Sequence, residues 1–502
     1  MESNREIERH EYFTPGEVCF FFEHDPKEAV NIDELRSKNK EVWNVIEGMS
    51  SRCLDVQTFG GGEGDETAYS LVSAQMPIPR ILDSAQRGKL NYEVIRLIDE
   101  TYEGIQRGRF TDSPLRLAAV TPNWFSGAAQ HIIDGGPGAQ PVDGKLTQND
   151  LMPLQVQAVE EYINQRLIAQ KSYEPREVDV YVLDSIPLAE SWMHLVRMQD
   201  RPKALLSLLE KLTITTAAEL GTTLPDEHYE IAGHTYEMSD HGLFIAGLIH
   251  GQAPEAKIHL LEVLNRFGVG TMKSLLAGLE AIKNIKRPTI INCSLMMGPQ
   301  SSALIEKFPD WERMAQAEPA AETQRFTSKQ MRMPVNEYLA AMMQPVEKII
   351  AQRVAALGGS EWVKIVASAG NDSRGDRVRK PARRPAAFAN VIGIAALDNN
   401  NRHASYSNYA DNPLNEGMAA FGGVADINTN TTDPIHGIAS LYIGKLPDGS
   451  WTNGTARWAG TSFAAGVVSG LLAKLVSAGE TCDNAEQFLR NLRSFDVPDI
   501  VT

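Results

Sequence analysis

From residue 178 onward, short apolar runs alternate with segments of helical periodicity. The apolar runs occupy residues 178–183, 257–264, 289–295, 363–367 and 391–397. Strands that alternate with helices are typical of βαβ units, which assemble into a parallel sheet with helices on both faces. This part of the chain is therefore expected to form an α/β unit on a parallel sheet.

The chain before residue 123 has a different pattern. Strand-like runs at residues 17–22, 68–76 and 115–120 surround helix-like runs at residues 32–49 and 81–108. Mixed strands and helices of this kind predict a small α+β domain.

Glycine and proline divide the chain between these two patterns. We expect an N-terminal domain over residues 1–122, a linker over residues 123–150 and the α/β unit over residues 151–502. Extra helical segments at about residues 188–212 and 302–333 are interpreted as insertions into that unit.

Charge and cysteine content narrow the classes of function. The net charge of −16 argues against nucleic-acid or anionic-membrane partners, because these select basic surfaces. No apolar stretch near the start suits a secretory signal or a transmembrane span, and the four cysteines form no CxxC pair. We expect a reduced, cytoplasmic protein, with export by another route left open.

Three polar residues, Asp184, His241 and Ser462, lie at predicted strand ends or helix starts and are of the types that nucleophilic catalysis uses. Ser462 opens the apolar helical segment 466–476, and the free amides of a helix N-terminus favour developing negative charge. His241 begins another helical pattern, and Asp184 follows the strand-like run 178–183. A serine nucleophile needs a base, and the base needs a carboxylate to orient it. Taken alone, Ser462 is equally typical of a helix cap, whereas His241 and Asp184 are more typical of a structural contact and of a turn or helix cap, respectively.

A fourth polar residue, Asn371, follows the strand-like run 363–367 and a glycine. A side-chain amide held there can donate a hydrogen bond to an oxyanion. The same residues also suit an Asn-Asp turn.

In chain order, the blocks around Asp184, His241, Asn371 and Ser462 resemble the signature blocks of the subtilisin-like serine peptidases, the subtilase family. The segments 251–256, 290–295 and 385–396 resemble further blocks of that family. The sedolisin-like peptidases instead have glutamate and aspartate at the positions of His241 and Asn371. The resemblance covers roughly residues 150–480 and implies a subtilisin-like parallel sheet flanked by helices, preceded here by the small α+β domain.

The resemblance implies a serine endopeptidase that acts on proteins or peptides. Ser462 is expected to be the nucleophile, His241 the base, Asp184 the residue that orients it, and Asn371 an oxyanion donor. The residues that the resemblance assigns to substrate binding are Ser294, Leu295, Met296, Gly298, Ala369, Gly370, Arg383 and Arg384. Arg383 or Arg384 could bind an acidic side chain of the substrate. Alternatively, both arginines could be solvated surface residues.

Other implications stay open. The sequence departs from the family pattern at Ile186, Leu243, Phe244 and Gly466, so a catalytically weak or inactive peptide-binding or regulatory protein is the alternative function. The N-terminal domain resembles a prodomain in position, which makes it a candidate intramolecular inhibitor, or else a regulatory domain. Self-cleavage in the linker, near Asp134 or Asp143, would fit the prodomain interpretation.

No cofactor is expected to be required. Structural calcium is common in the family, and the oxygen-rich loops 398–401 and 426–430 are candidates, although such loops are more often turns.

Overall fold

The computed structural model describes residues 5–7, 13–27, 30–49, 55–59, 67–78, 86, 90–91, 93–98, 100–101, 115–128, 140–144, 161–162, 176–231, 234–235, 237–282, 285–298, 335–373, 379–410, 417–426 and 431–496. Most of the helix expected at 81–108 and all of the insertion expected at 302–333 lie outside these residues.

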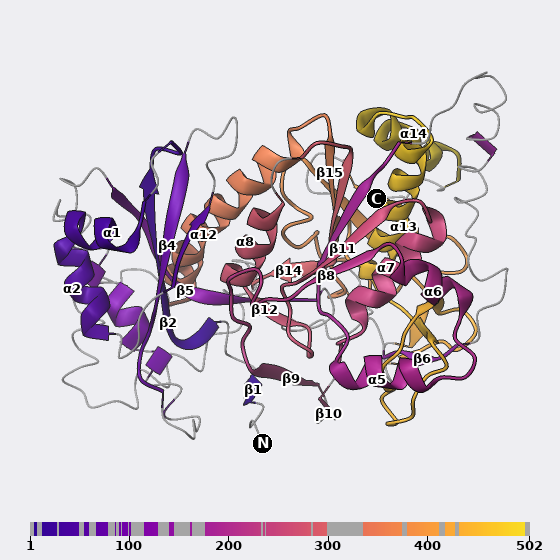
Figure 1. Ribbon diagram of the computed structural model, residues 1–502, viewed down its shortest axis with the longest axis horizontal. Helices are drawn as coiled ribbons and strands as arrows, with labels where there is room; N and C mark the ends of the chain where they lie inside the picture. The colour runs from indigo at the N-terminus through magenta and orange to yellow at the C-terminus, as the bar shows by residue number, and fades with distance from the viewer. Residues whose placement is uncertain are drawn as a thin grey trace.

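The larger unit is built on a seven-stranded parallel sheet, so the predicted α/β architecture is confirmed (Figure 1). The strand order is β17-β16-β15-β13-β7-β11-β8, and every neighbouring pair is parallel. The strands are β7 (Asp179–Asp184), β8 (Leu212–Thr215), β11 (Lys257–Glu262), β13 (Thr289–Cys293), β15 (Val363–Ser368), β16 (Val391–Leu397) and β17 (Met418–Phe421). All residues of β13 and β16 are buried, as expected for strands covered on both faces.

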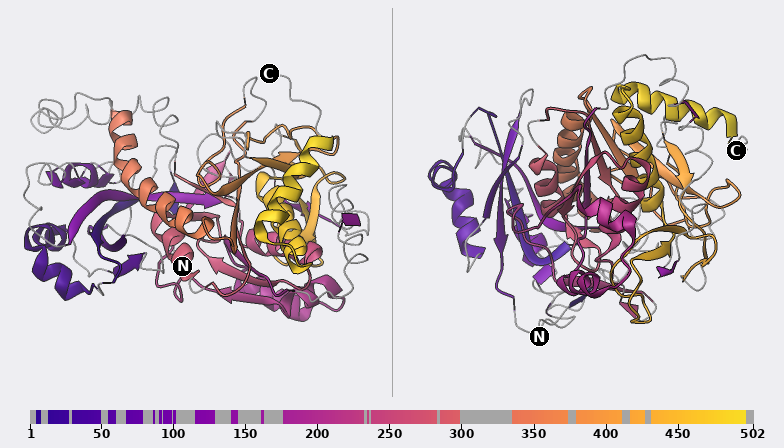
Figure 2. Two further views of the ribbon diagram at one scale, coloured as in Figure 1. Left: turned by 90° about the horizontal axis from the view of Figure 1, so that it is seen from above. Right: turned by 45° about the vertical axis from the view of Figure 1, so that its right-hand side comes forward.

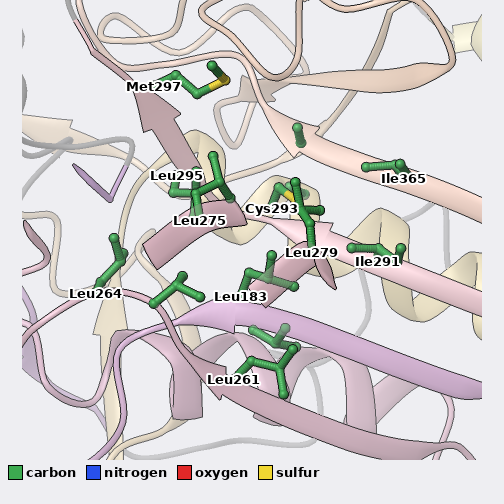
Figure 3. Close-up of a cluster of buried hydrophobic side chains, with 14 of the residues drawn as sticks. Leu183, Leu261, Leu264, Leu275, Leu279, Ile291, Cys293, Leu295, Met297 and Ile365 are labelled. Atoms are coloured by element: carbon green, nitrogen blue, oxygen red, sulfur yellow. The ribbon is translucent and has the colours of Figure 1, made fainter. Parts of the chain in front are cut away.

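Helices cover both faces of this sheet. The described helices of the larger unit are α5 (Ala189–Arg197), α6 (Lys203–Leu209), α7 (His241–Gln252), α8 (Met272–Ala281), α12 (Val335–Gly358), α13 (Thr461–Ser477) and α14 (Cys482–Asp496). Helices α7 and α13 pack against each other, whereas α8 and α12 lie on the side that faces the N-terminal part of the chain (Figure 1). Figure 3 shows the core between the sheet and α8, where Leu183, Ile291 and Leu279 meet.

The N-terminal unit contains an antiparallel sheet, and the helix expected over residues 32–49 is present as two helices. Residues 93–98, within the helix expected at 81–108, are also helical. Its strands are β2 (Phe13–His24), β3 (Asp55–Phe59), β4 (Ala68–Gln75) and β5 (Arg116–Ala128), in the order β5-β2-β4-β3. Helices α1 (Ile32–Lys38) and α2 (Lys40–Met49) cover the face turned away from the larger unit (Figure 2). The side chains of Val42, Trp43, Ile46 and Met49 on α2 are buried, since they repeat with helical spacing along one face.

Strand β5 extends beyond the residue at which the linker was expected to begin. Residues 123–128 were expected to be linker, but they continue β5 and reach from the N-terminal unit to the larger one (Figure 1 and Figure 2). There they pair with β12 (Val269–Thr271) and β14 (Leu295–Met297). Trp124 and Phe125 are buried, so apolar packing holds this stretch in the sheet.

The remaining described strands are short. They are β1 (Arg5–Ile7), β6 (Val142–Asp143), β9 (Glu227–Ile231), β10 (His234–Thr235), β18 (Ala425–Asp426), β19 (Thr431–Thr432), β20 (Ile438–Leu441) and β21 (Thr455–Trp458). Within the ranges given above, no helix combines the length and apolar character needed to cross a bilayer.

Candidate active site

The polar residues singled out in the sequence meet at the carboxyl edge of the parallel sheet. Asp184 is the last residue of β7, Ser294 directly follows β13, and Asn371 lies just beyond β15. The N-termini of α7 and α13 bring His241 and Ser462 to the same edge. Open α/β sheets place their ligand sites at this edge, because the loops after parallel strands converge there.

Asp184 and His241 form a close, buried pair. The Nδ1 atom of His241 lies 2.8 Å from Oδ1 and 2.9 Å from Oδ2 of Asp184, and both side chains are fully buried. The backbone N–H of Ser185 donates a further hydrogen bond of 2.8 Å to Oδ1. A carboxylate at Nδ1 favours the tautomer with its hydrogen on that nitrogen, which leaves Nε2 as the basic atom.

Close approach of α7 to β7 makes this pair possible. A Cβ atom at Gly242 would lie 2.3 Å from the carbonyl oxygen of Ser185 and 2.9 Å from Cβ of Asp184. Only glycine therefore lets the first turn of α7 sit on the end of β7. Gly242, in the sequence Asp-His-Gly, therefore allows the close packing of α7 on β7 directly beside the imidazole.

Aromatic side chains enclose the imidazole. The rings of Trp458 and Phe463 have centroids 5.4 Å and 5.3 Å from that of His241. The Nε2 atom is buried and has no hydrogen-bond partner within the part of the chain that the structure describes. Because Phe463 follows Ser462 directly, its contact with the imidazole places the backbone of Ser462 beside His241.

Ser462 is the second residue of α13 and is fully buried. Its Oγ donates to the carbonyl oxygen of Ser294 at 3.4 Å, and Oγ of Ser294 donates to the carbonyl oxygen of Ser462 at 3.0 Å. The structure thus pairs Ser462 with Ser294 rather than with Nε2 of His241. Hydrogen bonds between catalytic groups are commonly long or poorly aligned until substrate is bound.

Asn371 is oriented by Thr461, the residue before Ser462. Its Oδ1 accepts hydrogen bonds from the backbone N–H and the hydroxyl of Thr461, both at 3.0 Å. The same hydroxyl accepts from the N–H of Gly370 at 3.2 Å. These contacts turn the amide oxygen toward α13.

Gly370 adopts a backbone angle that favours glycine, with φ of +107°. A Cβ atom there would also lie 2.7 Å from Nδ2 of Asn408 and 3.0 Å from Cγ of Arg383. Ala369 is fully buried, and its N–H donates to the carbonyl oxygen of Ile394 at 2.9 Å. Both residues shape the loop that carries Asn371.

The strand that follows Ser294, β14, is paired with strand β5 of the N-terminal unit. In the antiparallel register, Leu295 lies opposite Ala128 and Met296 opposite Gly127. The N–H of Gly298 continues this ladder with a 3.0 Å hydrogen bond to the carbonyl oxygen of Phe125. On the other edge of β5, Gly127 lies opposite Val269.

Arg383 differs from the expectation that it binds substrate. Its side chain is 5% exposed, and its Nε and Nη2 atoms donate to Asp372 at 2.8 Å and 2.9 Å. The guanidinium is therefore already paired inside the protein. Arg384 is more exposed, but its guanidinium pairs with Glu347 of α12. Burial raises the pKa of Glu347, although the charge of Arg384 opposes that rise.

Several residues of this site were not found from the sequence. Asp372, Asn408 and Thr461 hold the loop of Asn371, and Ser185 supports Asp184. Only Thr461 carried a signal, because it belongs to the Gly-Thr-Ser block.

In the first calcium candidate, the side chain of Asp398 holds its own loop. In the loop 398–401, Oδ1 of Asp398 accepts from the N–H groups of Asn400 and Arg402 at 2.8 Å and 2.9 Å, as in an ordinary Asx turn. Residues 427–430 of the second loop lie outside the described residues. Among the described residues, no cluster of three or more His, Cys, Asp or Glu side chains is arranged to hold a metal ion.

Solved structures similar to this chain include a cold-adapted subtilisin-like serine proteinase, with 16% identity, coverage of 62% of this chain and 81% of that one, and a TM-score of 0.34. The protease domain of PatA has 19% identity, coverage of 66% and 92%, and a TM-score of 0.36. A lanthipeptide protease has 16% identity, coverage of 70% and 91%, and a TM-score of 0.38.

Among characterised proteins, the minor extracellular protease Epr of Bacillus subtilis (strain 168) is 27% identical over 196 residues. The match takes in 36% of this chain and 22% of that protein, so this chain matches less than a quarter of the relative's length. The sequence model of the subtilase family matches residues 215–493, a range that includes His241, Asn371 and Ser462. Because that range is more than half of the 502 residues, the chain belongs to the subtilase family.

Proposed function

We propose that the protein is a serine endopeptidase that hydrolyses peptide bonds through an acyl-enzyme on Ser462. The observation that carries the proposal is the buried hydrogen bond between Asp184 and Nδ1 of His241, beside the serine that opens α13. A binding module would need neither a buried carboxylate–imidazole pair nor a hydroxyl at a helix N-terminus next to it. The membership of the subtilase family supports the same activity.

In the proposed mechanism, Nε2 of His241 takes the proton from Ser462 as Oγ attacks the scissile carbonyl carbon. Asp184 holds the imidazole in the required tautomer and stabilises its charged form. The amide of Asn371 and the N–H groups at the start of α13 donate to the oxyanion. His241 then gives its proton to the leaving amine, and water releases the acyl group by the same steps in reverse order.

The test uses a fluorescent peptidyl phosphonate, which phosphonylates an activated serine. Wild-type protein is expected to be labelled and Ser462→Ala protein is not. Ser469→Ala provides a matched control, because Ser469 lies on the same helix and its Oγ accepts a hydrogen bond from Asn292 at 3.0 Å. Equal labelling of wild type and Ser462→Ala would remove the assignment of the nucleophile.

We further propose that the N-terminal unit is an intramolecular inhibitor. Strand β5 pairs with β14, whose first residue directly follows the Ser294 carbonyl that Ser462 contacts. An extended substrate would use the same strand edges, since main-chain pairing is how peptides add to exposed strands. Self-cleavage is then expected shortly after Ala128, at the end of β5, rather than at Asp134 or Asp143. Intact-mass analysis of wild type against Ser462→Ala would locate the cut.

A reducing, cytoplasmic location is also a proposal. Cys19, Cys293 and Cys482 are buried and free of disulfides, which is typical of reducing compartments. The relative named above is, by its name, extracellular. Cell fractionation with an antibody against the N-terminal unit would decide between the two locations.

A further inference from the structure

A buried charged cluster lies beside the proposed oxyanion residue and is not part of the triad. Arg383 and Asp372 are joined by two parallel hydrogen bonds of 2.8 Å and 2.9 Å, and Nδ2 of Asn408 donates to Asp372 at 2.7 Å. All three residues are buried, at 4%, 2% and 0% exposure. Bidentate pairs fix the relative orientation of both groups more strictly than single hydrogen bonds do.

This cluster holds the chain on both sides of Asn371. The N–H of Asp372 donates to Oδ1 of Asn408 at 3.0 Å, and the N–H of Asn408 donates to the carbonyl oxygen of Gly370 at 2.9 Å. Nδ2 of Asn408 also donates to the carbonyl oxygen of Ala369 at 3.2 Å. The backbone before and after Asn371 is therefore anchored to a single side chain, which is itself anchored to the ion pair.

The same cluster connects Asn371 to the strand beside which a substrate would lie. The N–H of Arg383 donates to the carbonyl oxygen of Ala369 at 2.8 Å. The carbonyl oxygen of the next residue, Arg384, accepts from the N–H of Met297 in β14 at 2.8 Å. A displacement of Arg383 would thus change the spacing between the loop of Asn371 and β14.

We infer that Asp372 and Arg383 are positioning residues that set Asn371 at the correct place relative to β14 for oxyanion binding. The inference rests on the proposed peptidase function. Neither residue needs to touch the substrate, because both side chains are buried and occupied by each other. Their effect passes through Asn408 and the backbone of residues 369–372.

The principal test is the paired variant Asp372→Leu/Arg383→Met. It removes both charges at similar volume, a change that buried ion pairs often tolerate without loss of stability. With a peptide substrate, kcat is expected to fall about 10- to 100-fold while KM changes little, because a misplaced oxyanion donor is less harmful than a missing one. The inhibition constant of a peptide aldehyde, whose adduct carries the oxyanion, is expected to rise by the same factor as kcat/KM falls.

A double-mutant cycle shows whether the pair acts through Asn371. Asn371→Ala should cost less activity in the paired variant than in wild type, because the donor is already out of place there. Arg383→Lys keeps the charge and loses the bidentate geometry, so an intermediate loss of kcat is expected. This single variant carries the test if the paired variant does not fold.

Lys364→Met is the matched control. Lys364 lies near the start of β15, the strand that leads to Asn371, and it forms ion pairs of 2.6 Å and 2.7 Å with Asp483 and Glu486. Its loss is expected to leave kcat and aldehyde inhibition unchanged. A folded paired variant with wild-type kcat, or losses that add fully with Asn371→Ala, would overturn the inference alone. A wild-type chain that neither hydrolyses peptide nor cuts itself after β5 would instead contradict the proposed function and with it the inference.

Discussion

At the scale of single residues, Asp184 decides which imidazole nitrogen of His241 is basic. Both carboxylate oxygens lie within 2.9 Å of Nδ1, and both side chains are fully buried. Replacement by asparagine keeps the shape but allows the amide to donate to Nδ1, which favours the tautomer with hydrogen on Nε2. A histidine in that tautomer cannot take the proton from Ser462.

We therefore predict that Asp184→Asn lowers kcat by about 10⁴-fold, the loss seen for this change in serine peptidase triads. Steady-state kinetics on a peptide substrate would measure it. Asp179→Asn is the matched control, because Asp179 begins the same strand and its Oδ1 lies 3.1 Å from Nε2 of His259, away from the site. Similar losses in both variants would argue for damage to β7 rather than to the triad.

Asp240, directly before His241, carries a second prediction. It is fully buried, and its carboxylate accepts from the N–H of Ile443 at 3.1 Å and the hydroxyl of Ser239 at 3.2 Å. Burial raises its pKa from 3.8 to about 7, and the nearby charge of Glu237 adds to the rise. The folded chain therefore holds this proton more tightly than the unfolded chain does.

The stabilisation from that proton is complete below the unfolded pKa, near pH 4, and is lost as the pH rises through about 7. Wild type should thus lose up to about 4 kcal/mol of unfolding free energy relative to Asp240→Asn between about pH 4 and about pH 8. Urea unfolding of both proteins across this range would measure the difference. If the unfolding free energies of the two proteins changed with pH in the same way, the pKa of Asp240 would not be raised in the folded protein.

The sequence predicted the positions of some site residues but not the contacts of others, and the reason is physical. Asp184, His241 and Ser462 stand next to local signals, namely a strand end or a helix start. The partner of Arg383 had no such signal, because Asp372 is 11 residues away in the chain and no local pattern links the two. An expectation from resemblance therefore gave Arg383 a substrate contact, whereas its guanidinium is paired inside the protein.

At the scale of elements, the contact between α7 and β7 controls the geometry of the proposed triad. We predict that Gly242→Ala lowers stability by about 1–3 kcal/mol, because the added methyl group would meet backbone and Cβ atoms that cannot move independently. It should also lower kcat, since α7 must shift and His241 is its first residue. Thermal unfolding and peptide hydrolysis would measure the two effects.

Gly251→Ala, at the other end of α7, is the control for this prediction. A Cβ atom there meets nothing within 4 Å. Alanine favours the helix over glycine by up to about 1 kcal/mol, so this variant should be as stable as wild type or more so. If Gly242→Ala behaved in the same way, the close approach of α7 to β7 would not be a constraint.

Five of the seven strands of the parallel sheet, namely β7, β11, β13, β15 and β16, were predicted because each contains a largely apolar run. Strands β8 and β17 were not predicted, because they are short, lie at the two edges of the sheet and are only partly buried. The run 178–183 corresponds to β7 and the run 391–397 matches β16. Strand β5 was predicted only in its first part, because Pro122 and the polar residue after it resemble a break. Its continuation depends on partners in another unit, β12 and β14, which a local pattern does not reveal.

At the scale of the whole molecule, two units meet through β5 and through a buried polar cluster. Glu17 on β2 accepts a hydrogen bond of 2.8 Å from Asn123 on β5, and another from Ser73 on β4. Its carboxylate also lies 3.9 Å from Nζ of Lys273, which belongs to α8 of the larger unit and has a side chain only 6% exposed. The sequence predicted both units but not this contact, because its members lie far apart in the chain.

We predict that Glu17→Ala raises the peptidase activity of the full chain. Removing one partner leaves Lys273 buried without its anionic neighbour, which costs about 3 kcal/mol in comparable pairs. If the N-terminal unit covers the cleft as proposed, that loss weakens docking and increases the open fraction by about 100-fold at most. Initial rates on a short fluorogenic peptide, measured on uncleaved protein, would report the change.

The control separates undocking from general damage to the N-terminal sheet. Glu23 lies on the same strand, and its ion pair with Arg116 is 3.3 Å long and exposed, so Glu23→Ala should change stability by less than about 1 kcal/mol. Equal rates for wild type, Glu17→Ala and Glu23→Ala would mean that β5 does not limit access to Ser462. A rise in Glu17→Ala alone would instead link a single buried carboxylate to the activity of a site in the other unit, because β5 joins the sheet of Glu17 to the strand that follows Ser294.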